Sequence, residues 1–428
     1  MLINNRLRHL LVPSFLNGTL TAGDALSLAM QLVMNAPIDK KIDVKSYEKA
    51  VAEALNTPNV FALGAGRMAL YLLLKCLELE PEAEVILPGY TCVVMPNAVR
   101  FAGFRPRYVD IRLSDFNLDP AALEAAISAK TRAVLMQHTF GIPADIMAVQ
   151  AICKRHNLFL IEDGAHALGA SYRGKPIGCW GDAAFFSTET SKMISTDKGG
   201  LLVTSDAALA AKIRTLYESL PIRSPESERI ACKRVIYNVL MQDQWVNLLE
   251  RLIRRVFTIS IADYSRVKAY FSSHWSEYEA ELSGVQFDLY PRRLAGILCR
   301  IGELQVYRLK EDVKKRNEKA AFLAEILPKF GARVPSYDLD QCYPSFVKYP
   351  FLVEDRERWI KALNKLRLAN STWLNDPLHP RETRCHLENR YEWGSCPNAE
   401  YASQHILNLP VGRSVSFSML ARLKNLNL

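Results

Sequence analysis

Hydrophobic and polar positions follow two alternating patterns between residues 60 and 218. Short apolar runs, typical of buried strands, alternate with segments whose apolar positions recur at helical spacing. Strands are predicted at 60–63, 85–87, 107–111, 133–137, 158–161, 183–186 and 201–206, and helices at 68–77, 92–101, 120–128, 144–155 and 207–218. This alternation predicts an α/β fold with a mainly parallel sheet that helices cover on both faces.

The pattern changes on either side of this stretch. Helices are predicted at 22–34 and 46–55, one long helix at 294–327, and then a strand at 346–353 and helices at 356–366 and 416–426. Residues 219–285 lack the strand-helix rhythm. We therefore expect a large domain over 1–290 with an atypical helical insertion at about 219–285, followed by a connecting helix and a smaller α+β domain over 291–428.

The insertion contains an amphipathic pattern at 235–257. Three arginines, Arg251, Arg254 and Arg255, lie at the edge of one broad apolar face, which consists of Tyr237, Leu240, Trp245, Leu248, Leu249, Leu252 and Val256. A helix of this kind packs onto the protein or lies on an anionic membrane. Packing is the commoner outcome and is our expectation, with peripheral membrane contact as the alternative.

Composition narrows the class of protein. The chain has 428 residues, of which 49% are hydrophobic and 23% charged, which is typical of a globular protein. Its nine cysteines are scattered without metal-ligand spacing, so we expect free thiols in a reducing cytoplasm and no metal site. No apolar run reaches the length of a membrane span. The net charge of +9 suits a polyanionic substrate, a nucleic acid or an anionic membrane, and does not distinguish them.

Two residues at strand ends suggest cofactor chemistry. Asp163 follows the strand at 158–161, and Lys192 follows the strand at 183–186. The carboxyl ends of parallel strands are where open α/β sheets bind ligands. A pyridoxal phosphate site needs a lysine for the Schiff base and an aspartate that keeps the pyridine nitrogen protonated. A surface ion pair is the alternative interpretation of the same two residues.

Two further features lie at strand ends. Gly64, Ala65 and Gly66 join a strand to a helix, and small residues at a helix start expose amides that bind phosphate. A tight turn without ligand would have the same glycines. His138 follows the strand at 133–137, where it would contact a ligand or bond to nearby backbone.

Several segments together resemble one known family, the DegT-type sugar-nucleotide aminotransferases, which are pyridoxal phosphate enzymes of the aspartate aminotransferase fold (fold type I). The likeness covers about 45–220 and 286–428. Its segments, in family order, are GAGRMAL, ILPGYTCVVMPNAVRFAGFRPRYVDI, HTFGIPADI, IEDGAHALGA, GDAAFFSTETSK and DKGGLLVTSD, with PNAEYASQHILNLPVG near the end.

The resemblance implies a role for each matching residue. Lys192 would bind the cofactor covalently, Asp163 would pair with its pyridinium nitrogen, and His166 would contact its phenolic oxygen. The cofactor's phosphate would be bound by the backbone amides of Gly66, Arg67 and Met68 and by the hydroxyl of Ser187.

This chain departs from the family at three places. Cys92 stands where a ring normally stacks on the cofactor, so a thiol covers that face or Tyr90 takes over. Pro291 stands where the family has an asparagine that reaches the phosphate of the partner subunit, with Arg292 and Arg293 beside it as replacements. The insertion at 219–285 is longer than the family's usual connection.

The function implied is amino transfer from an amino acid, glutamate by family habit, to a nucleotide-linked keto-sugar, in amino-sugar, surface polysaccharide or natural-product biosynthesis. Lys192 favours transfer, because the dehydratase branch of the family has histidine there. The implied assembly is a homodimer that binds no nucleic acid. The alternatives are a regulatory or structural protein that binds pyridoxal phosphate, and a transaminase for a membrane-linked or non-sugar acceptor.

Overall fold

The large domain is built on a seven-stranded sheet of order β1-β10-β9-β6-β5-β2-β4. The computed structural model describes residues 19–34, 40–222, 224–240, 280, 283–287, 290–380 and 383–428. Strands β9, β6, β5, β2 and β4 run parallel, and β10 is antiparallel to both of its neighbours. The strands are β1 Asn59–Leu63, β2 Glu84–Pro88, β4 Arg105–Val109, β5 Thr131–Gln137, β6 Phe159–Asp163, β9 Ala183–Ser187 and β10 Gly200–Thr204. The predicted mainly parallel α/β sheet is confirmed.

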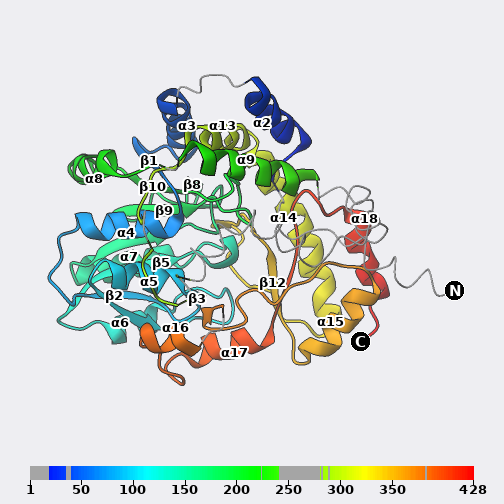
Figure 1. Ribbon diagram of the computed structural model, residues 1–428. Coiled ribbons are helices and arrows are strands. Elements are labelled where there is room, and N and C mark those ends of the chain that lie inside the picture. Colours follow the sequence, from blue (N-terminus) through cyan, green and yellow to red (C-terminus); the bar gives the residue numbers. More distant parts are fainter. Residues whose placement is uncertain are drawn as a thin grey trace.

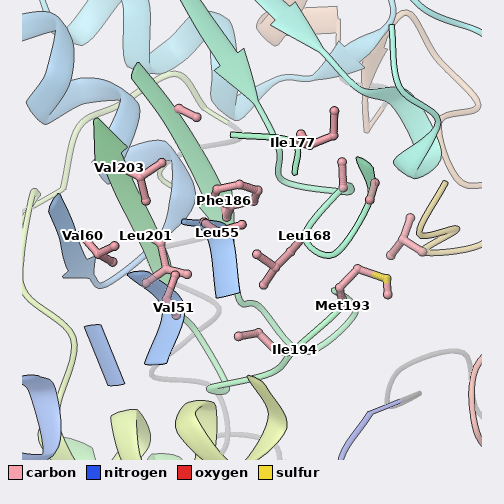
Figure 2. Close-up of a cluster of buried hydrophobic side chains, with 14 of the residues drawn as sticks. Val51, Leu55, Val60, Leu168, Ile177, Phe186, Met193, Ile194, Leu201 and Val203 are labelled. Carbon is pink, nitrogen blue, oxygen red and sulfur yellow. The ribbon is translucent and has the colours of Figure 1, made fainter. Parts of the chain in front are cut away.

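The strands are continuous apolar runs because both faces of the sheet are buried. Alternate residues of each strand enter different cores, as Phe186 and Phe185 do on β9. Figure 2 shows the core on the Phe186 side, where Val60, Leu201 and Val203 meet Val51 of helix α3, which spans Lys40–Leu55. The helices that follow the strands are α4 Gly66–Cys76, α5 Val94–Phe101, α6 Pro120–Ala126, α7 Ile146–Arg155 and α8 Ala207–Ser219.

Aspartate caps begin three of these helices. Asp119 accepts a hydrogen bond from the amide of Ala121 at the start of α6. Asp145 and Asp206 cap α7 and α8 in the same way. Each side chain satisfies an amide that has no acceptor inside its helix.

A layer of helices covers one side of the large domain (Figure 1). It contains α2 Ala22–Met34, α3 Lys40–Leu55, α9 Pro225–Leu240 and α13 Gly296–Val306, with α13 against α3 and α9 against α2. Leu298 and Ile301 of α13 are buried in the core of the large domain. Helix α13 therefore packs onto the large domain.

The single helix predicted at 294–327 is wrong. The chain forms α13 and a separate helix α14 Leu309–Ile326, which runs toward the C-terminal domain in Figure 1. At the break, the guanidinium of Arg308 donates to the carboxylate of Asp24 at 2.7 and 3.0 Å and to the carbonyl of Thr19 at 3.4 Å. These partners come from the other end of the chain, so the local pattern did not reveal the break.

The C-terminal domain is α+β, as predicted. Its sheet pairs β12 Tyr349–Leu352 with β14 Ile406–Leu409 in antiparallel register, so the predicted strand at 346–353 is shorter than expected. The predicted helix at 416–426 is a short α-helix followed by a 3-10 helix. The helices of this part of the chain are α15 Arg356–Lys365, α16 Thr383–Glu388, α17 Pro397–His405, α18 Phe417–Leu420, η4 Leu327–Phe330 and η5 Ala421–Asn425.

Short strands connect the two domains. β3 Thr91–Cys92 pairs in parallel with β13 Leu378–His379. β7 Ser171–Tyr172 pairs with β11 Cys342–Tyr343 and with β8 Lys175–Pro176. The 3-10 helix η2 Thr139–Gly141 follows β5 at the edge of the sheet. These pairings bring the C-terminal domain over the carboxyl ends of the sheet strands.

The described part of the insertion is packed. Helix α9 buries Ala231, Cys232, Val235 and Val239 in the core of the large domain. The rest of the pattern predicted at 235–257, including Trp245, Leu249 and the three arginines, lies outside the described residues. In the described part of the chain, no helix is both long and apolar enough to span a membrane.

Candidate active site

A cavity of about 480 Å³ opens at the carboxyl ends of β5, β6 and β9. Its lining brings together seven of the predicted residues: Gly66, Arg67, Cys92, Asp163, His166, Ser187 and Lys192. The other predicted residues, all within the described part of the chain, lie outside the lining: Met68, Tyr90, His138, Arg292 and Arg293. The cavity is therefore assembled from segments spread over more than a hundred positions of the sequence.

Asp163 ends β6 and is 3% exposed. Its Oδ1 accepts a hydrogen bond of 2.9 Å from the amide of Ala165. Burial raises the pKa of Asp163 to about 6, while the Ala165 hydrogen bond and the positive charge of Lys192 act in the opposite direction. A buried carboxylate of this kind gains most from a cation placed against it, such as a protonated pyridine ring.

Lys192 lies in the segment between β9 and β10, and its amide donates to the carbonyl of Glu189 at 2.9 Å. Its Nζ is 4.9 Å from the ring centre of Trp373. Desolvation lowers the pKa of Lys192, whereas its interactions with Glu189, Cys92 and Asp163 act in the opposite direction. A lowered pKa increases the fraction of neutral amine, which is the form that attacks an aldehyde.

The start of α4 has the properties of a phosphate cradle. Its N-cap is Ala65, whose side chain makes no capping bond, so the first amides of the helix have no acceptor within it. A Cβ at Gly66 would lie only 3.1 Å from the carbonyl oxygen of Phe186, so a close approach needs glycine here. The amide of Met68, which was predicted to bind the phosphate, instead donates to the carbonyl of Ala65 at 3.1 Å. Gly66 and Arg67 therefore remain the candidate amide donors.

Ser187 and His166 supply further polar groups. Ser187 Oγ accepts a long hydrogen bond of 3.5 Å from the amide of Glu189, so its hydrogen can point to a ligand. His166 Nδ1 accepts from the amide of Phe140 at 3.2 Å, which assigns the proton of the neutral ring to Nε2. Burial and the charges of Lys192 and Lys348 lower the pKa of His166. His166 is thus a neutral donor, as a contact to a phenolic oxygen requires.

Tyr90 is not placed to cover a ligand in the cavity. It is fully buried, and its ring packs against Phe116 and Phe140 at centroid distances of 6.3 and 6.4 Å. Cys92, two residues later, lines the cavity. Of the two alternatives for the stacking position, the structure favours the thiol over Tyr90.

His138 makes hydrogen bonds within the protein core. Its Nδ1 accepts from the amide of Ala144 at 3.0 Å, and its Nε2 lies 3.3 Å from Glu162 Oε2. Glu162 also accepts hydrogen bonds from the amides of Gly178, Trp180 and Gly181. These contacts satisfy both ring nitrogens of His138 within the protein core, so the structure favours backbone bonding over ligand contact.

Arg292 and Arg293 interact within their own chain. Arg292 is 1% exposed, and its side chain packs so closely on Gly64 that a Cβ there would lie 2.7 Å from Arg292 Cγ. Arg293 Nε donates to the carbonyl of Leu220 at 3.2 Å. Arg292 is thus buried within its own chain and Arg293 is half-buried, and the contact of one of them with a partner subunit stays a prediction.

The cavity also contains groups that sequence reasoning missed. Gln137 ends β5, accepts from Thr91 Oγ1 at 2.6 Å and donates to the carbonyl of Tyr90 at 3.0 Å. The strand-end rule that selected Asp163 would have found Gln137. Lys198 also lines the cavity and lies in the DKGG segment. Trp373 carried no local signal, because it reaches Lys192 through the packing of the C-terminal domain.

These residues fit pyridoxal phosphate. A buried carboxylate, a partly buried lysine with lowered pKa and a helix start without a side-chain cap surround one cavity. In the described part of the chain, no group of three or more His, Cys, Asp and Glu residues could hold a metal ion. Eight cysteines whose side chains the structure describes are free thiols: Cys76, Cys92, Cys153, Cys179, Cys232, Cys299, Cys342 and Cys396.

Comparisons with known proteins agree with this geometry. GDP-perosamine synthase of Caulobacter vibrioides is 40% identical over 173 residues, which are 40% of this chain and 47% of that protein, so the match spans about half of that relative. A protein of Geobacillus stearothermophilus named pleiotropic regulatory protein is 37% identical over 371 residues, 86% of this chain and 84% of that one. The structure of Helicobacter pylori PseC, an aminotransferase involved in the biosynthesis of pseudoaminic acid, has a TM-score of 0.72 at 21% identity over 97% of both chains.

The family profile covers nearly the whole chain. The profile of the DegT/DnrJ/EryC1/StrS aminotransferase family matches residues 28–249 and 260–423, a range that includes both domains, Asp163 and Lys192. The chain therefore belongs to the DegT/DnrJ/EryC1/StrS aminotransferase family, whose enzymes depend on pyridoxal phosphate.

Proposed function

We propose that this protein transfers an amino group from an amino acid, glutamate being the expected donor, to a nucleotide-linked keto-sugar. The observation that carries the proposal is the meeting of the buried Asp163 and the half-buried Lys192 in one cavity beside the start of α4. A surface ion pair, the alternative for these two residues, would not be buried against the carboxyl ends of three sheet strands.

Pyridoxal phosphate, when bound, supplies an aldehyde that takes up the amino group and a ring that takes up electrons from the carbon losing a proton. Asp163 keeps the pyridine nitrogen protonated, because burial makes its own charge dependent on a neighbouring cation. Lys192 Nζ accepts and returns the proton at the substrate carbon, a task for which a lowered pKa is suited. His166 would donate to the cofactor from Nε2, and Gly66, Arg67 and Ser187 would hold its phosphate.

The acceptor class rests on charge and on similarity. Arg67 and Lys198 place positive charge in the cavity lining, and the chain carries a net charge of +9. A nucleotide diphosphate is a polyanion that such a surface attracts. The name GDP-perosamine synthase belongs to a relative that forms a nucleotide-linked amino sugar. We extend this substrate class to the present chain, without choosing the sugar or the carbon.

A second candidate function is regulation. The Geobacillus relative that matches 86% of this chain bears the name of a regulatory protein, so the fold and the cofactor alone do not establish catalysis. The two candidates differ in what they require of Asp163. Catalysis needs its charge at the pyridine nitrogen, whereas a binding protein needs the cofactor in place as a ligand.

The decisive experiment combines protein loaded with pyridoxal phosphate, glutamate and a panel of nucleotide-linked keto-sugars, with products identified by mass spectrometry. We expect one amino-sugar nucleotide to form with wild-type protein and its yield to collapse with Asp163→Asn that still retains the cofactor. Turnover that is equal in the two proteins would exclude the proposed mechanism. Cofactor binding without any product across the panel and several amino donors would favour regulation.

A further inference from the structure

The segment that carries Lys192 is a closed loop, residues 188–199, which we call the Lys192 loop. At its base the amide of Thr188 donates to the carbonyl of Gly199, and the amide of Thr196 donates to the carbonyl of Thr188, both at 2.8 Å. The Oγ1 atoms of Thr188 and Thr196 are 2.6 Å apart. Hydrogen bonds within the loop thus close its base, whereas the position of Lys192 depends on the contacts that hold the rest of the loop.

One external anchor comes from α13. Gln305 Oε1 accepts from the amide of Ser195 at 2.9 Å, and Gln305 Nε2 donates to the carbonyl of Ser195 at 2.7 Å. Gln305 is 1% exposed and is itself held by Thr19 Oγ1 at 2.9 Å. Both backbone groups of Ser195 are therefore tied to a buried side chain of a neighbouring helix.

The second external anchor comes from α9, in the insertion. Arg234 donates to both carboxylate oxygens of Asp197, from Nε at 2.7 Å and from Nη2 at 2.5 Å. Asp197 is 2% exposed and Arg234 is 9% exposed. A bidentate pair of this kind fixes orientation as well as distance.

Asp197 transmits this anchor toward Lys192. Its carbonyl accepts from both the amide and the Oγ1 of Thr190, each at 3.1 Å, and Thr190 is two residues before Lys192. The φ angle of Asp197 is 65°, in the left-handed region that glycine adopts most easily. The chain therefore keeps an aspartate in a strained, buried position where a glycine would fit without cost. The ion pair between its carboxylate and Arg234 explains why position 197 is an aspartate.

We propose that Arg234 is a positioning residue for Lys192. Acting through Asp197 and Thr190, it holds the Lys192 loop in place, and it makes α9 a structural support of the active site. Glu228 is buried on the same helix, and its charge acts on the Cys232 thiol together with the charges of Asp197 and Arg234. This inference rests on the proposed role of Lys192. The support that the Arg234–Asp197 pair gives to the Lys192 loop can nevertheless be tested without the cofactor.

The test compares Arg234→Met, Asp197→Gly and the double variant with wild type. Each single variant leaves one buried charge without its main counter-ion, so both should lower the melting temperature. The double variant removes both charges and gives position 197 a residue suited to φ of 65°, so its melting temperature should recover. If the Arg234–Asp197 pair were purely structural, hydrogen exchange in the Lys192 loop and cofactor capture would recover together with the melting temperature.

Positioning predicts a different result for the double variant. Amide hydrogen exchange of residues 188–199, measured without cofactor, should stay faster than in wild type in all three variants. The rate at which Lys192 captures pyridoxal phosphate, followed by absorbance, should stay about 10-fold to 100-fold slower, because small displacements of a reacting group have effects of this size. The pH midpoint of the change in the bound cofactor's absorbance should also differ from its wild-type value in all three variants.

A control is Arg413→Met, which breaks the ion pair that this partly exposed arginine makes with the buried Asp312 in the C-terminal domain, at 2.5 Å. It should lower the melting temperature without changing exchange in the Lys192 loop. Wild-type exchange, capture rate and absorbance midpoint in a thermally recovered double variant would overturn the proposal. Wild-type protein that fails to capture the cofactor on Lys192 would instead contradict the proposed function, and the exchange measurement would still decide whether Arg234 holds the loop.

Discussion

The ammonium nitrogen of Lys192 lies 4.9 Å from the ring centre of Trp373, a residue from much later in the chain. Lys348 approaches the same ring, with its Nζ 4.2 Å from the centre. The ring of His166 is 4.7 Å away, centroid to centroid. Trp373 therefore joins the two domains at the reactive lysine, and it places a second lysine near the first.

Borohydride reduction should attach the cofactor to Lys192. Protein purified with pyridoxal phosphate is expected to be yellow, because Lys192 is the lysine in the cavity with its pKa lowered by burial and Asp163 nearby. Peptide mapping by mass spectrometry after reduction reads out the modified residue. Lys198, which also lines the cavity, is the internal control. Modification of Lys198 in place of Lys192 would show that the assignment is wrong.

Asp163→Asn should stabilise the protein without cofactor, in a pH-dependent way. The pKa of Asp163 is about 6 in the fold against 3.8 in the unfolded chain, so ionising this carboxyl costs more in the folded state. The cost is complete above pH 6, shrinks as pH falls, and vanishes below 3.8. Asparagine removes it and should raise the free energy of unfolding by about 3 kcal/mol at pH 7.5.

Chemical denaturation at pH 7.5, 5 and 3.5 measures this effect. The stabilisation should decrease in that order, and the same variant should lose turnover by several orders of magnitude when loaded with cofactor, because a neutral partner no longer favours the pyridinium ion. A gain in stability that does not vary with pH would contradict the burial of a titrating carboxylate.

Lys348→Met should also stabilise the protein without cofactor, with the opposite pH dependence. Lys348 is 8% exposed, and burial together with the charge of Lys192 lowers its pKa to about 7. Because the unfolded chain holds that proton up to pH 10.5, the cost of the charge is complete below pH 7 and disappears above 10.5. The expected gain is about 3 to 5 kcal/mol at pH 6.5.

Unfolding experiments at pH 6.5 and 9.5 separate this effect from a simple change of packing. The gain should be smaller at pH 9.5, whereas packing alone would give equal values. Lys361→Met on the exposed face of α15 is the control, since its side chain is 76% exposed and should change stability little at either pH.

Val235→Ala should destabilise the protein by roughly 1 to 3 kcal/mol, because the methyl groups it removes are buried. Val235 is 1% exposed on α9. Leu216→Ala on α8, where the side chain is 40% exposed, should have little effect. If α9 instead served membrane contact, the Val235 variant would keep its stability and lose binding to anionic liposomes in a flotation assay.

The protein should be a homodimer at working concentrations. This prediction rests on the family resemblance, which places Arg292 or Arg293 where a residue would reach the partner's cofactor phosphate. Within its own chain Arg292 is 1% exposed, and Arg293 is half-buried. Light scattering coupled to gel filtration, with activity measured across the same dilution series, tests it. Full activity in a monomeric fraction would contradict a shared active site.

The sequence by itself determined the sheet and singled out Asp163 and Lys192, which line one cavity. Strands β5, β6 and β9 are apolar runs because both of their faces are buried, and this pattern is visible without any knowledge of neighbours. Asp163 follows directly, since the carboxyl end of a parallel strand is where such sheets place functional groups. The helix cap at Asp119 is a local feature, because the amide that donates to its side chain is only two residues away.

The tertiary structure decided the features whose partners lie far along the chain. The break before α14 depends on Asp24, the surroundings of Lys192 on Trp373, and the support of the Lys192 loop on Arg234. Tyr90 and Cys92 illustrate the same limit, because a difference of two positions decided which one entered the cavity and which one entered the core. Periodicity specifies which face of an element is buried, whereas the packing of elements decides what that face meets.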